Sequence, residues 1–370
     1  MVRESGNAGT QEQIKELEER IAKTKYNKKT QHAIGLYKAK LAALKEKQEK
    51  RSGTGKSDHG WTVRKSGDAS VVLLGFPSVG KSSLLNAITN ANSEVGSYAF
   101  TTLDCIPGDL EYKGSKIQIL DVPGIVRGAA AGTGRGKEVL QVIRNADLIV
   151  LLIDVFFPEH LDVLLKEVFD TYVRLDQKKP DVRIKKTTKG GVSVGTTVPL
   201  SHLTDDTIKG ILKEFRISNA DVLLREDINA DQLIDIVEGN RVYVPSLRVL
   251  NKIDMVDEKH LEKIKAEVNP DICISASGGV NLDELKEQIF QKLELMPVYC
   301  KEAGNKADLD EPLILRKGDT IRDMCRKLHK DFEKKFRFAR VWGESAKFPG
   351  QKLSLKHELS HEDIVEIHVR

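Results

Sequence analysis

One eight-residue stretch, Gly75-Phe-Pro-Ser-Val-Gly-Lys-Ser82, limits the possible folds of this chain more than any other. It has the spacing Gly-x-x-x-x-Gly-Lys-Ser, in which backbone N–H groups surround phosphates. The apolar run 71–74 before it predicts a buried strand, and residues 83–88 predict the start of a helix. That order turns a helix N-terminus toward a polyphosphate. We therefore predict a polyphosphate site formed by Gly75, Pro77, Ser78, Val79, Gly80, Lys81, Ser82 and Ser83.

Several residues in and after this loop suit a magnesium-bound triphosphate. Lys81 can reach the outer phosphates, and the Ser82 hydroxyl can ligate Mg²⁺. Asp121-Val-Pro-Gly124 ends the predicted strand 116–120, so Asp121 can hold Mg²⁺ through water and the Gly124 N–H can contact a γ-phosphate. Between these motifs, Thr102 is our choice for a further Mg²⁺ ligand, with Thr101 second. The predicted metal set is Ser82, Thr102 and Asp121, and the predicted catalytic set is Lys81, Thr102 and Gly124.

A base-reading motif follows another apolar run. In Asn251-Lys252-Ile-Asp254, the Asp254 carboxylate can accept hydrogen bonds from the guanine N1–H and exocyclic amine, while the stem of Lys252 stacks on the base. Adenine has no matching pair of donors, and an unpaired carboxylate costs about 1–3 kcal/mol, which argues against an ATPase. Residues Ser275, Ala276 and Ser277 suit a loop whose Ala276 N–H meets the guanine oxygen, although both serines could simply shape the turn.

The position after Asp-x-x-Gly departs from the expected pattern. A glutamine that orients the attacking water often stands there, and Ile125 cannot do this, so intrinsic GTP hydrolysis should be slow. Arg127 and Arg135 could stabilise transition-state charge or lie on the surface. A partner, RNA or a monovalent cation could complete the site; Ser78 occupies the position where some cation-activated relatives have asparagine. A non-hydrolysing adaptor that binds RNA or the ribosome, with nucleotide only stabilising its fold, stays open as the alternative.

The chain divides into several regions around this site. Alternating strand and helix signals over 66–296 predict an α/β fold with a doubly wound parallel sheet, interrupted at 165–245 by an inserted α+β subdomain. Within the insert, residues 183–194 suggest a β-hairpin around a glycine turn, and 204–215 and 231–238 suggest helices. Residues 1–65 predict a basic helical hairpin and linker, which should pack on the main domain or on a partner. Residues 297–370 predict a small α+β unit with a mixed sheet.

Composition shows an uneven distribution of charge and indicates the cellular compartment. Residues 1–65 carry 16 Lys/Arg against 8 Asp/Glu, and residues 297–370 carry 16 against 13, whereas the whole chain has a net charge of +4. The basic ends suggest a polyanionic partner, although solvated helical surfaces explain them equally well. The N-terminus lacks a secretory core and there is no apolar run long enough to span a membrane. The scattered cysteines are typical of a reduced, cytoplasmic protein: Cys105, Cys273, Cys300 and Cys325.

The motifs together resemble the developmentally regulated GTP-binding protein family of translation-associated GTPases. The phosphate loop, Tyr98-Ala-Phe-Thr-Thr-Leu103, Asp121-Val-Pro-Gly-Ile125 and Asn251-Lys-Ile-Asp254 carry the resemblance, and Gly318-Asp-Thr320 with Asp363-Ile-Val-Glu-Ile367 resembles a TGS domain of β-grasp fold. The resemblance implies a cytoplasmic P-loop GTPase that binds and hydrolyses GTP to GDP with Mg²⁺ and acts with ribosomes. It also implies a zinc-finger regulatory protein as partner and a monomeric or heterodimeric state.

Overall fold

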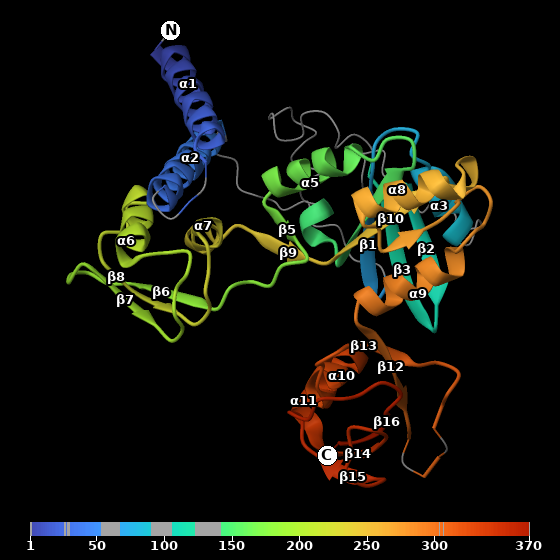
Figure 1. Ribbon diagram of the computed structural model, residues 1–370. Helices are drawn as coiled ribbons and strands as arrows, with labels where there is room; N and C mark the ends of the chain where they lie inside the picture. Colours follow the sequence, from blue (N-terminus) through green and yellow to red (C-terminus); the bar gives the residue numbers. More distant parts are fainter. Residues whose placement is uncertain are drawn as a thin grey trace. The chain divides into compact units, whose positions relative to one another are not determined.

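The chain forms two compact units (Figure 1). This computed structural model describes residues 2–25, 27, 30–52, 67–89, 106–122, 142–302, 304–305 and 307–369. Unit 1 comprises Met1–Gly60 and Lys178–Tyr243, and unit 2 comprises Trp61–Gln177 and Val244–Arg370. The predicted linker after residue 52 lies outside the described residues. In the described part of the chain, no helix combines the length and apolar character needed to cross a membrane.

Unit 2 contains a six-stranded sheet in the order β11-β10-β4-β1-β3-β2. Five strands are parallel, and β2 pairs antiparallel with β3 at one edge. The sheet therefore confirms the predicted doubly wound architecture, in which ligands bind beyond the carboxyl ends of the strands. Its strands are β1 (Ala69–Leu74), β2 (Ile106–Tyr112), β3 (Ser115–Asp121), β4 (Leu148–Asp154), β10 (Ser246–Asn251) and β11 (Ile272–Cys273).

Helices cover both faces of this sheet, so its central strands are apolar on both faces. All six residues of β1 and all seven of β4 are buried, as expected for central parallel strands. Helices α3 (Lys81–Ile88) and α9 (Leu282–Lys292) share a core with Val71 and Leu73 of β1. Helix α5 (His160–Asp170) packs on β4, and α8 (Glu258–Val268) follows β10 and the short η2 helix (Ile253–Met255).

Helix α5 also shifts the start of the insert. The sequence placed this start at residue 165, but α5 continues to Asp170 because Leu164 and Val168 are fully buried in unit 2. Strand β5 (Val173–Leu175) comes next, and the compact unit formed by the insert includes Lys178–Tyr243. Strand β9 (Val242–Val244) precedes the return of the chain to β10.

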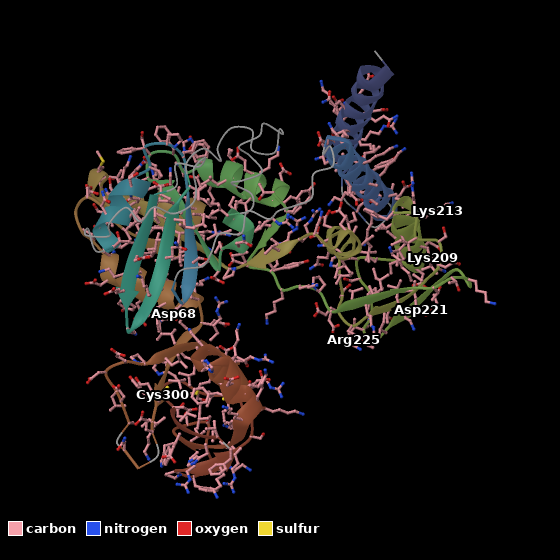
Figure 2. All side chains as sticks on the ribbon, turned by 180° about the vertical axis from the view of Figure 1, so that it is seen from behind. Asp68, Lys209, Lys213, Asp221, Arg225 and Cys300 are labelled. Atoms are coloured by element: carbon pink, nitrogen blue, oxygen red, sulfur yellow. The ribbon has the colours of Figure 1, made fainter. Side chains whose placement is uncertain are left out.

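The N-terminal hairpin packs on the insert within unit 1. Helices α1 (Val2–Lys23) and α2 (Gln31–Ser52) contact each other, and α2 contacts α6 (Asp205–Glu214) and α7 (Ala230–Glu238). The packing is close, since a Cβ at Gly210 of α6 would lie 2.6 Å from Leu36 Cδ2. Ala39 belongs to the same core as the buried face of α6, while Lys209 and Lys213 project from its outer face (Figure 2). The apolar side of α2 is thus buried against the insert.

The expected β-hairpin at 183–194 is wrong. Strands β6 (Val182–Lys186) and β7 (Val192–Thr196) do not pair with each other, because β8 (Ala220–Leu224) lies between them. Strand β8 is the most buried of the three, with Ala220, Val222 and Leu224 facing the core, so it takes the central position. The glycine turn exists, but it carries the chain past β8, where Asn219 Oδ1 accepts from the Gly191 N–H at 2.9 Å.

The C-terminal part of unit 2 is a mixed five-stranded sheet in the order β13-β12-β16-β14-β15. Its strands are β12 (Leu295–Cys300), β13 (Leu313–Arg316), β14 (Phe336–Trp342), β15 (Gln351–Leu353) and β16 (Ile364–Val369), and its helices are α10 (Ile321–Leu328) and α11 (Lys330–Lys335). Thr320 and Asp323 form a capping box at the start of α10. His329 is extended and ends α10, so Lys330 begins the separate helix α11.

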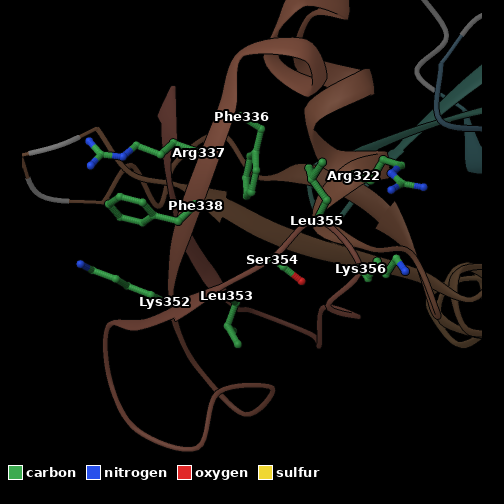
Figure 3. Close-up of a pocket in the computed structure, with 9 residues that line it drawn as sticks. All are labelled: Arg322, Phe336, Arg337, Phe338, Lys352, Leu353, Ser354, Leu355 and Lys356. Atoms are coloured by element: carbon green, nitrogen blue, oxygen red, sulfur yellow. The ribbon is translucent and has the colours of Figure 1, made fainter. Parts of the chain in front are cut away.

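The two phenylalanines of strand β14 lie on opposite sides of the strand (Figure 3). Phe336 packs on the domain core, but the register shifts between Phe336 and Phe338, so Phe338 lies on the other side of the strand (Figure 3). A β-bulge has this effect because one extra residue turns the following side chains. Phe338 stacks on His368, and Trp342 has Lys301 Nζ 4.1 Å from its ring centre.

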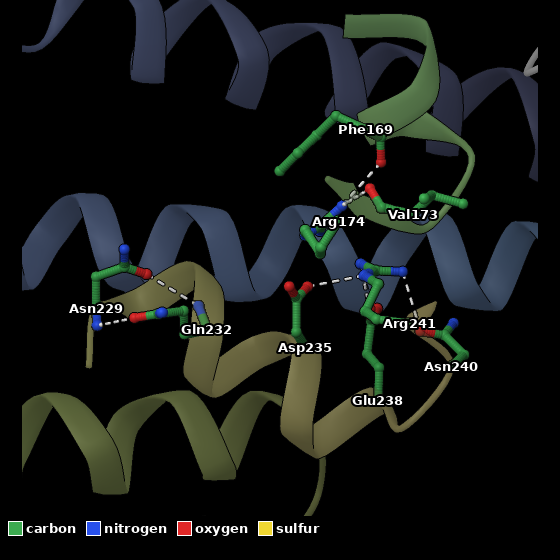
Figure 4. Close-up of polar contacts among 9 residues, drawn as sticks. All are labelled: Phe169, Val173, Arg174, Asn229, Gln232, Asp235, Glu238, Asn240 and Arg241. Atoms are coloured by element: carbon green, nitrogen blue, oxygen red, sulfur yellow. Dashed lines mark hydrogen bonds and ion pairs between the residues drawn. The ribbon is translucent and has the colours of Figure 1, made fainter. Parts of the chain in front are cut away.

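A buried ion-pair network in unit 1 fixes the C-terminal end of α7 (Figure 4). Asn229 and Gln232 form a capping box at its start, with both bonds at 2.9 Å. Beyond its end, Arg241 Nε donates to Asp235 Oδ1 at 2.7 Å and Arg241 also pairs with Glu238 at 2.5 Å. The side chains of this network are 9% exposed or less.

We expect Arg241→Met to destabilise unit 1 by about 3–5 kcal/mol, because it removes the cation from two buried ion pairs. Urea unfolding of the full chain, followed by circular dichroism, measures the loss. The matched control is Arg225→Met, since Arg225 pairs with Asp181 at 3.4 Å with half its side chain exposed and should cost less than about 1 kcal/mol. Equal midpoints for the two variants would contradict the prediction.

Candidate nucleotide-binding site

The loop between β1 and α3 has the backbone of a phosphate cradle. Gly80, the N-cap of α3, has φ of 99°, and Ser78 also lies in the left-handed region with φ of 62°. A Cβ at Gly80 would lie 2.6 Å from Asn251 Nδ2, so only glycine fits there. No side chain caps α3, which leaves its first N–H groups facing the loop, as phosphate binding requires. Pro77, Ser78, Ser82 and Ser83 are exposed, whereas Gly75 and Val79 are buried beneath them.

Lys81 is held over the loop by its carbonyl groups. Its ammonium donates to the oxygens of Gly75 and Phe76, each at 3.0 Å. Burial lowers the pKa of Lys81 from its ordinary value, and the nearby Asp121 carboxylate opposes this effect. The lysine is therefore a positioned cation, placed where the N-terminus of α3 and the loop N–H groups meet.

Ser82 and Asp121 form the candidate magnesium site. The Ser82 hydroxyl donates to Asp121 Oδ2 at 3.1 Å, and Asp121 is 6% exposed at the carboxyl end of β3. Its other oxygen, Oδ1, is buried without a hydrogen-bond partner among the described residues. A buried carboxylate oxygen beside a serine hydroxyl fits Mg²⁺, which uses one or two protein oxygens and completes its shell with water and phosphate. Within the described residues there is no group of three or more His, Cys, Asp or Glu suited to a metal.

Asn251 joins the phosphate loop to the predicted base-binding loop. Its amide donates from Nδ2 to the Val79 oxygen at 2.8 Å, and its Oδ1 accepts from the Ala276 N–H at 3.0 Å. Asn251 is 1% exposed, so both bonds are inside the protein. The Ala276 N–H, predicted to meet a guanine oxygen, is thus already bonded to Asn251, and a base would have to share this donor. Ser275 shapes the turn, since its Oγ accepts from the Gly278 N–H at 2.9 Å. The Oγ of Ser277 lies 3.4 Å from the Oγ of Ser275.

Lys252 and Asp254 follow at the end of β10. Lys252 has φ of 67° and donates from Nζ to the Ser78 oxygen at 2.8 Å, so its stem runs back to the phosphate loop. Asp254 is exposed on the η2 turn, where its carboxylate can accept from a ligand. The phosphate-loop residues and the predicted base-reading motif therefore lie at the same edge of the sheet. Thr101, Thr102, Gly124, Ile125, Arg127 and Arg135 lie outside the described residues.

Two residues of the site, Asp154 and His160, were not predicted from the sequence. Asp154 Oδ2 accepts from Lys252 Nζ at 2.6 Å, and Asp154 is 6% exposed at the end of β4. The sequence held a signal for Asp154 itself, since it directly follows the apolar run 148–153, but the structure alone shows that it pairs in register with Asn251 on the adjacent strand β10. His160 stacks on Phe76 with ring centres 3.7 Å apart, which fixes the outer side of the phosphate loop on α5. No short motif predicts that contact.

The fold and the site define a class. Three features found here are typical of a P-loop GTPase: a strand–loop–helix phosphate cradle with a positioned lysine, a Ser–Asp pair beside it, and Asn-Lys-x-Asp at the end of a strand in the same sheet. Family models agree: one described as "50S ribosome-binding GTPase" matches residues 70–186, one described as "C-terminal region of MMR_HSR1 domain" matches 189–295, and "TGS domain" matches 296–369.

Three relatives identify the family. An uncharacterized GTP-binding protein of Methanocaldococcus jannaschii is 55% identical over 98% of this chain and 93% of its own length. Developmentally-regulated GTP-binding protein 2 of Homo sapiens is 42% identical, covering 97% of this chain and 99% of its own. Developmentally-regulated G-protein 3 of Arabidopsis thaliana is 44% identical, covering 96% and 98%. The chain belongs to the developmentally regulated GTP-binding protein family, and the TGS domain predicted at its C-terminus is confirmed.

Proposed function

We propose that this chain is a switch that hydrolyses GTP to GDP and acts on ribosomes in the cytoplasm. One observation carries the proposal: three groups lie together at the carboxyl edge of one sheet. They are Lys81, the Ser82–Asp121 pair, and Asn251 with Lys252, which both bond to the phosphate loop. In the proposal, Lys81 and the Ser82–Asp121 pair serve the phosphates and Mg²⁺ at one end of the site, and Asp254 reads the base at the other. The "50S ribosome-binding GTPase" description of the matching family supports the ribosomal part.

In this proposal the chain's own residues bind and orient the triphosphate. The loop N–H groups and Lys81 face the β- and γ-phosphates, and Asp254 selects guanine. Mg²⁺, held by Ser82 and Asp121, would neutralise charge that develops on the phosphates. Thr102 and Gly124 are proposed to contact the metal and γ-phosphate from segments that order with GTP and relax after hydrolysis.

Hydrolysis by the chain alone should be slow, because Ile125 offers no group to orient water. We propose that an outside element supplies this group: the ribosome, a zinc-finger regulatory protein in a heterodimer, or a monovalent cation near Ser78. Ile125 also sustains the second candidate, a non-hydrolysing adaptor in which nucleotide stabilises the fold.

Phosphate release over many turnovers separates the two candidates. The assay compares the full chain alone, with ribosomes, with the regulatory protein, and with K⁺ replacing Na⁺. We expect slow release alone and an increase of at least tenfold with one of these additions. Asp121→Asn, which removes a metal ligand, is the inactive control. Nucleotide binding without release under every condition would favour the adaptor.

A further inference from the structure

A basic groove lies on the TGS domain, far along the chain from the nucleotide site (Figure 3). It has a volume of about 530 Å³ and is formed by α10, β14, β15 and the segment after β15. Four of its residues are cations and, of its lining residues, all of which the structure describes, none is acidic. The lining residues are Arg322, Phe336, Arg337, Phe338, Lys352, Leu353, Ser354, Leu355 and Lys356.

The groove combines these cations with the aromatic ring of Phe338. Arg337, Lys352 and Lys356 are exposed, whereas Phe338 is half-buried. The ring of Phe338 stacks on His368 with ring centres 4.3 Å apart, and this contact holds it in place. Lys352 Nζ lies 4.8 Å and the Arg337 guanidinium 5.8 Å from the centre of the same ring. A fixed ring with exposed cations beside it is a recurrent arrangement for binding single-stranded nucleic acids.

We propose that this groove binds single-stranded RNA, with one base stacked on Phe338 and the adjoining phosphates held by Arg337, Lys352 and Lys356. The inference rests on the ribosomal function proposed above and deepens it by assigning a site. Base stacking is stronger than a cation–π contact at an exposed site, so a base displaces Lys352 from the ring. The released ammonium then pairs with a phosphate. Duplex RNA keeps its bases stacked and hidden, which favours a single strand.

Three cations spaced four residues apart in the sequence, Arg322, Arg326 and Lys330, do not form a common basic face at this site. Arg326 is bound by Glu333, with bonds of 2.7 and 3.1 Å, and Lys330 lies on a different helix. Arg322 lines the groove, but its Nε lies 3.4 Å from the same Glu333, so it contributes less net charge. An acidic peptide could also meet the exposed cations, but it would not use the face of the Phe338 ring.

The test measures binding of a fluorescein-labelled 12-nucleotide oligouridylate to the full chain by fluorescence anisotropy at several salt concentrations. Arg337→Gln combined with Lys352→Gln should reduce the slope of log affinity against log salt by about 1.4, since each phosphate contact to a single strand contributes about 0.7. Phe338→Leu should weaken binding about tenfold and leave the slope unchanged. Photocrosslinking with 4-thiouridine in the oligonucleotide should mark peptides of β14 or β15.

Matched controls lie on the same domain outside the groove. Phe348→Leu removes a phenylalanine that is 60% exposed, and Lys317→Gln with Lys330→Gln removes two exposed cations. These variants should bind as the parent chain does, and GDP binding and melting temperature should be unchanged in all of them.

The proposal is overturned if the control variants weaken binding equally, if polyglutamate competes as well as RNA, or if the duplex binds as tightly as the single strand. A parent chain that binds GDP but no RNA would overturn it too, without touching the GTPase proposal.

Discussion

Replacing Asp254 by asparagine should change the preferred nucleotide from guanine to xanthine. In the proposed function the Asp254 carboxylate accepts from two guanine donors, whereas an asparagine amide can donate to the 2-oxo group of xanthine. Sites built around hydrogen bonds to a substrate group reject analogues that lack it by about 10⁴–10⁵-fold. Asp254 is exposed on the η2 turn, so the substitution should leave the fold intact. Competition titrations of GDP and XDP against a fluorescent nucleotide should therefore show a reversal of preference of about 10³-fold or more.

Asp257→Asn is the matched control for this experiment. Asp257 lies three residues away and caps α8 by accepting from the His260 N–H, a role that asparagine performs equally well. This variant should keep the guanine preference. If Asp254→Asn retains it too, Asp254 does not read the base and the proposed orientation of the nucleotide is wrong.

Replacing Lys81 by methionine should lower the rate of GTP hydrolysis by about 10²–10³-fold, the usual cost of removing one preorganised charge from a transition state. Methionine has nearly the length of the lysine stem but no charge. The variant also loses the bonds from Nζ to Gly75 and Phe76, although the loop keeps its Asn251 and Lys252 contacts. Phosphate release and binding of GTP and GDP measure the effect, and GTP binding should weaken more than GDP binding.

The control here is Lys263→Met, an exposed lysine on α8. It should hydrolyse GTP at the parent rate. Full activity in Lys81→Met would mean that the charge over the phosphate loop has no part in the reaction.

The sequence was sufficient for the central fold because its signals were local. Residues 71–74 form an unbroken apolar run before the phosphate loop, and Asp121 and Asn251 come at the ends of predicted strands, where parallel strands bring their ends together. Phosphate-loop glycines were predictable for the same reason, since a left-handed backbone at Gly80 follows from the motif itself.

The failures concern contacts between distant segments. Residues 183–194 have good local hairpin signals, and only the more apolar β8, about thirty residues later, decides that it lies between the two strands. Asp154 and Lys252 are 98 residues apart, and no spacing rule links them. The exposure of Phe338 depends on a register shift in β14, which hydrophobic periodicity does not reveal. Such features follow from competition among tertiary partners rather than from local propensity.

The docking of α2 onto α6 and α7 has a consequence for synthesis of the protein. Translation yields the N-terminal hairpin first, and the roughly 190 residues up to the end of α7 take roughly 10 to 40 seconds more at about 5–20 residues per second. Throughout that delay Ile34 and Ala39, both buried in the finished protein, await the helices that α2 packs against. The hairpin of a nascent chain must consequently be shielded from wrong partners throughout this interval.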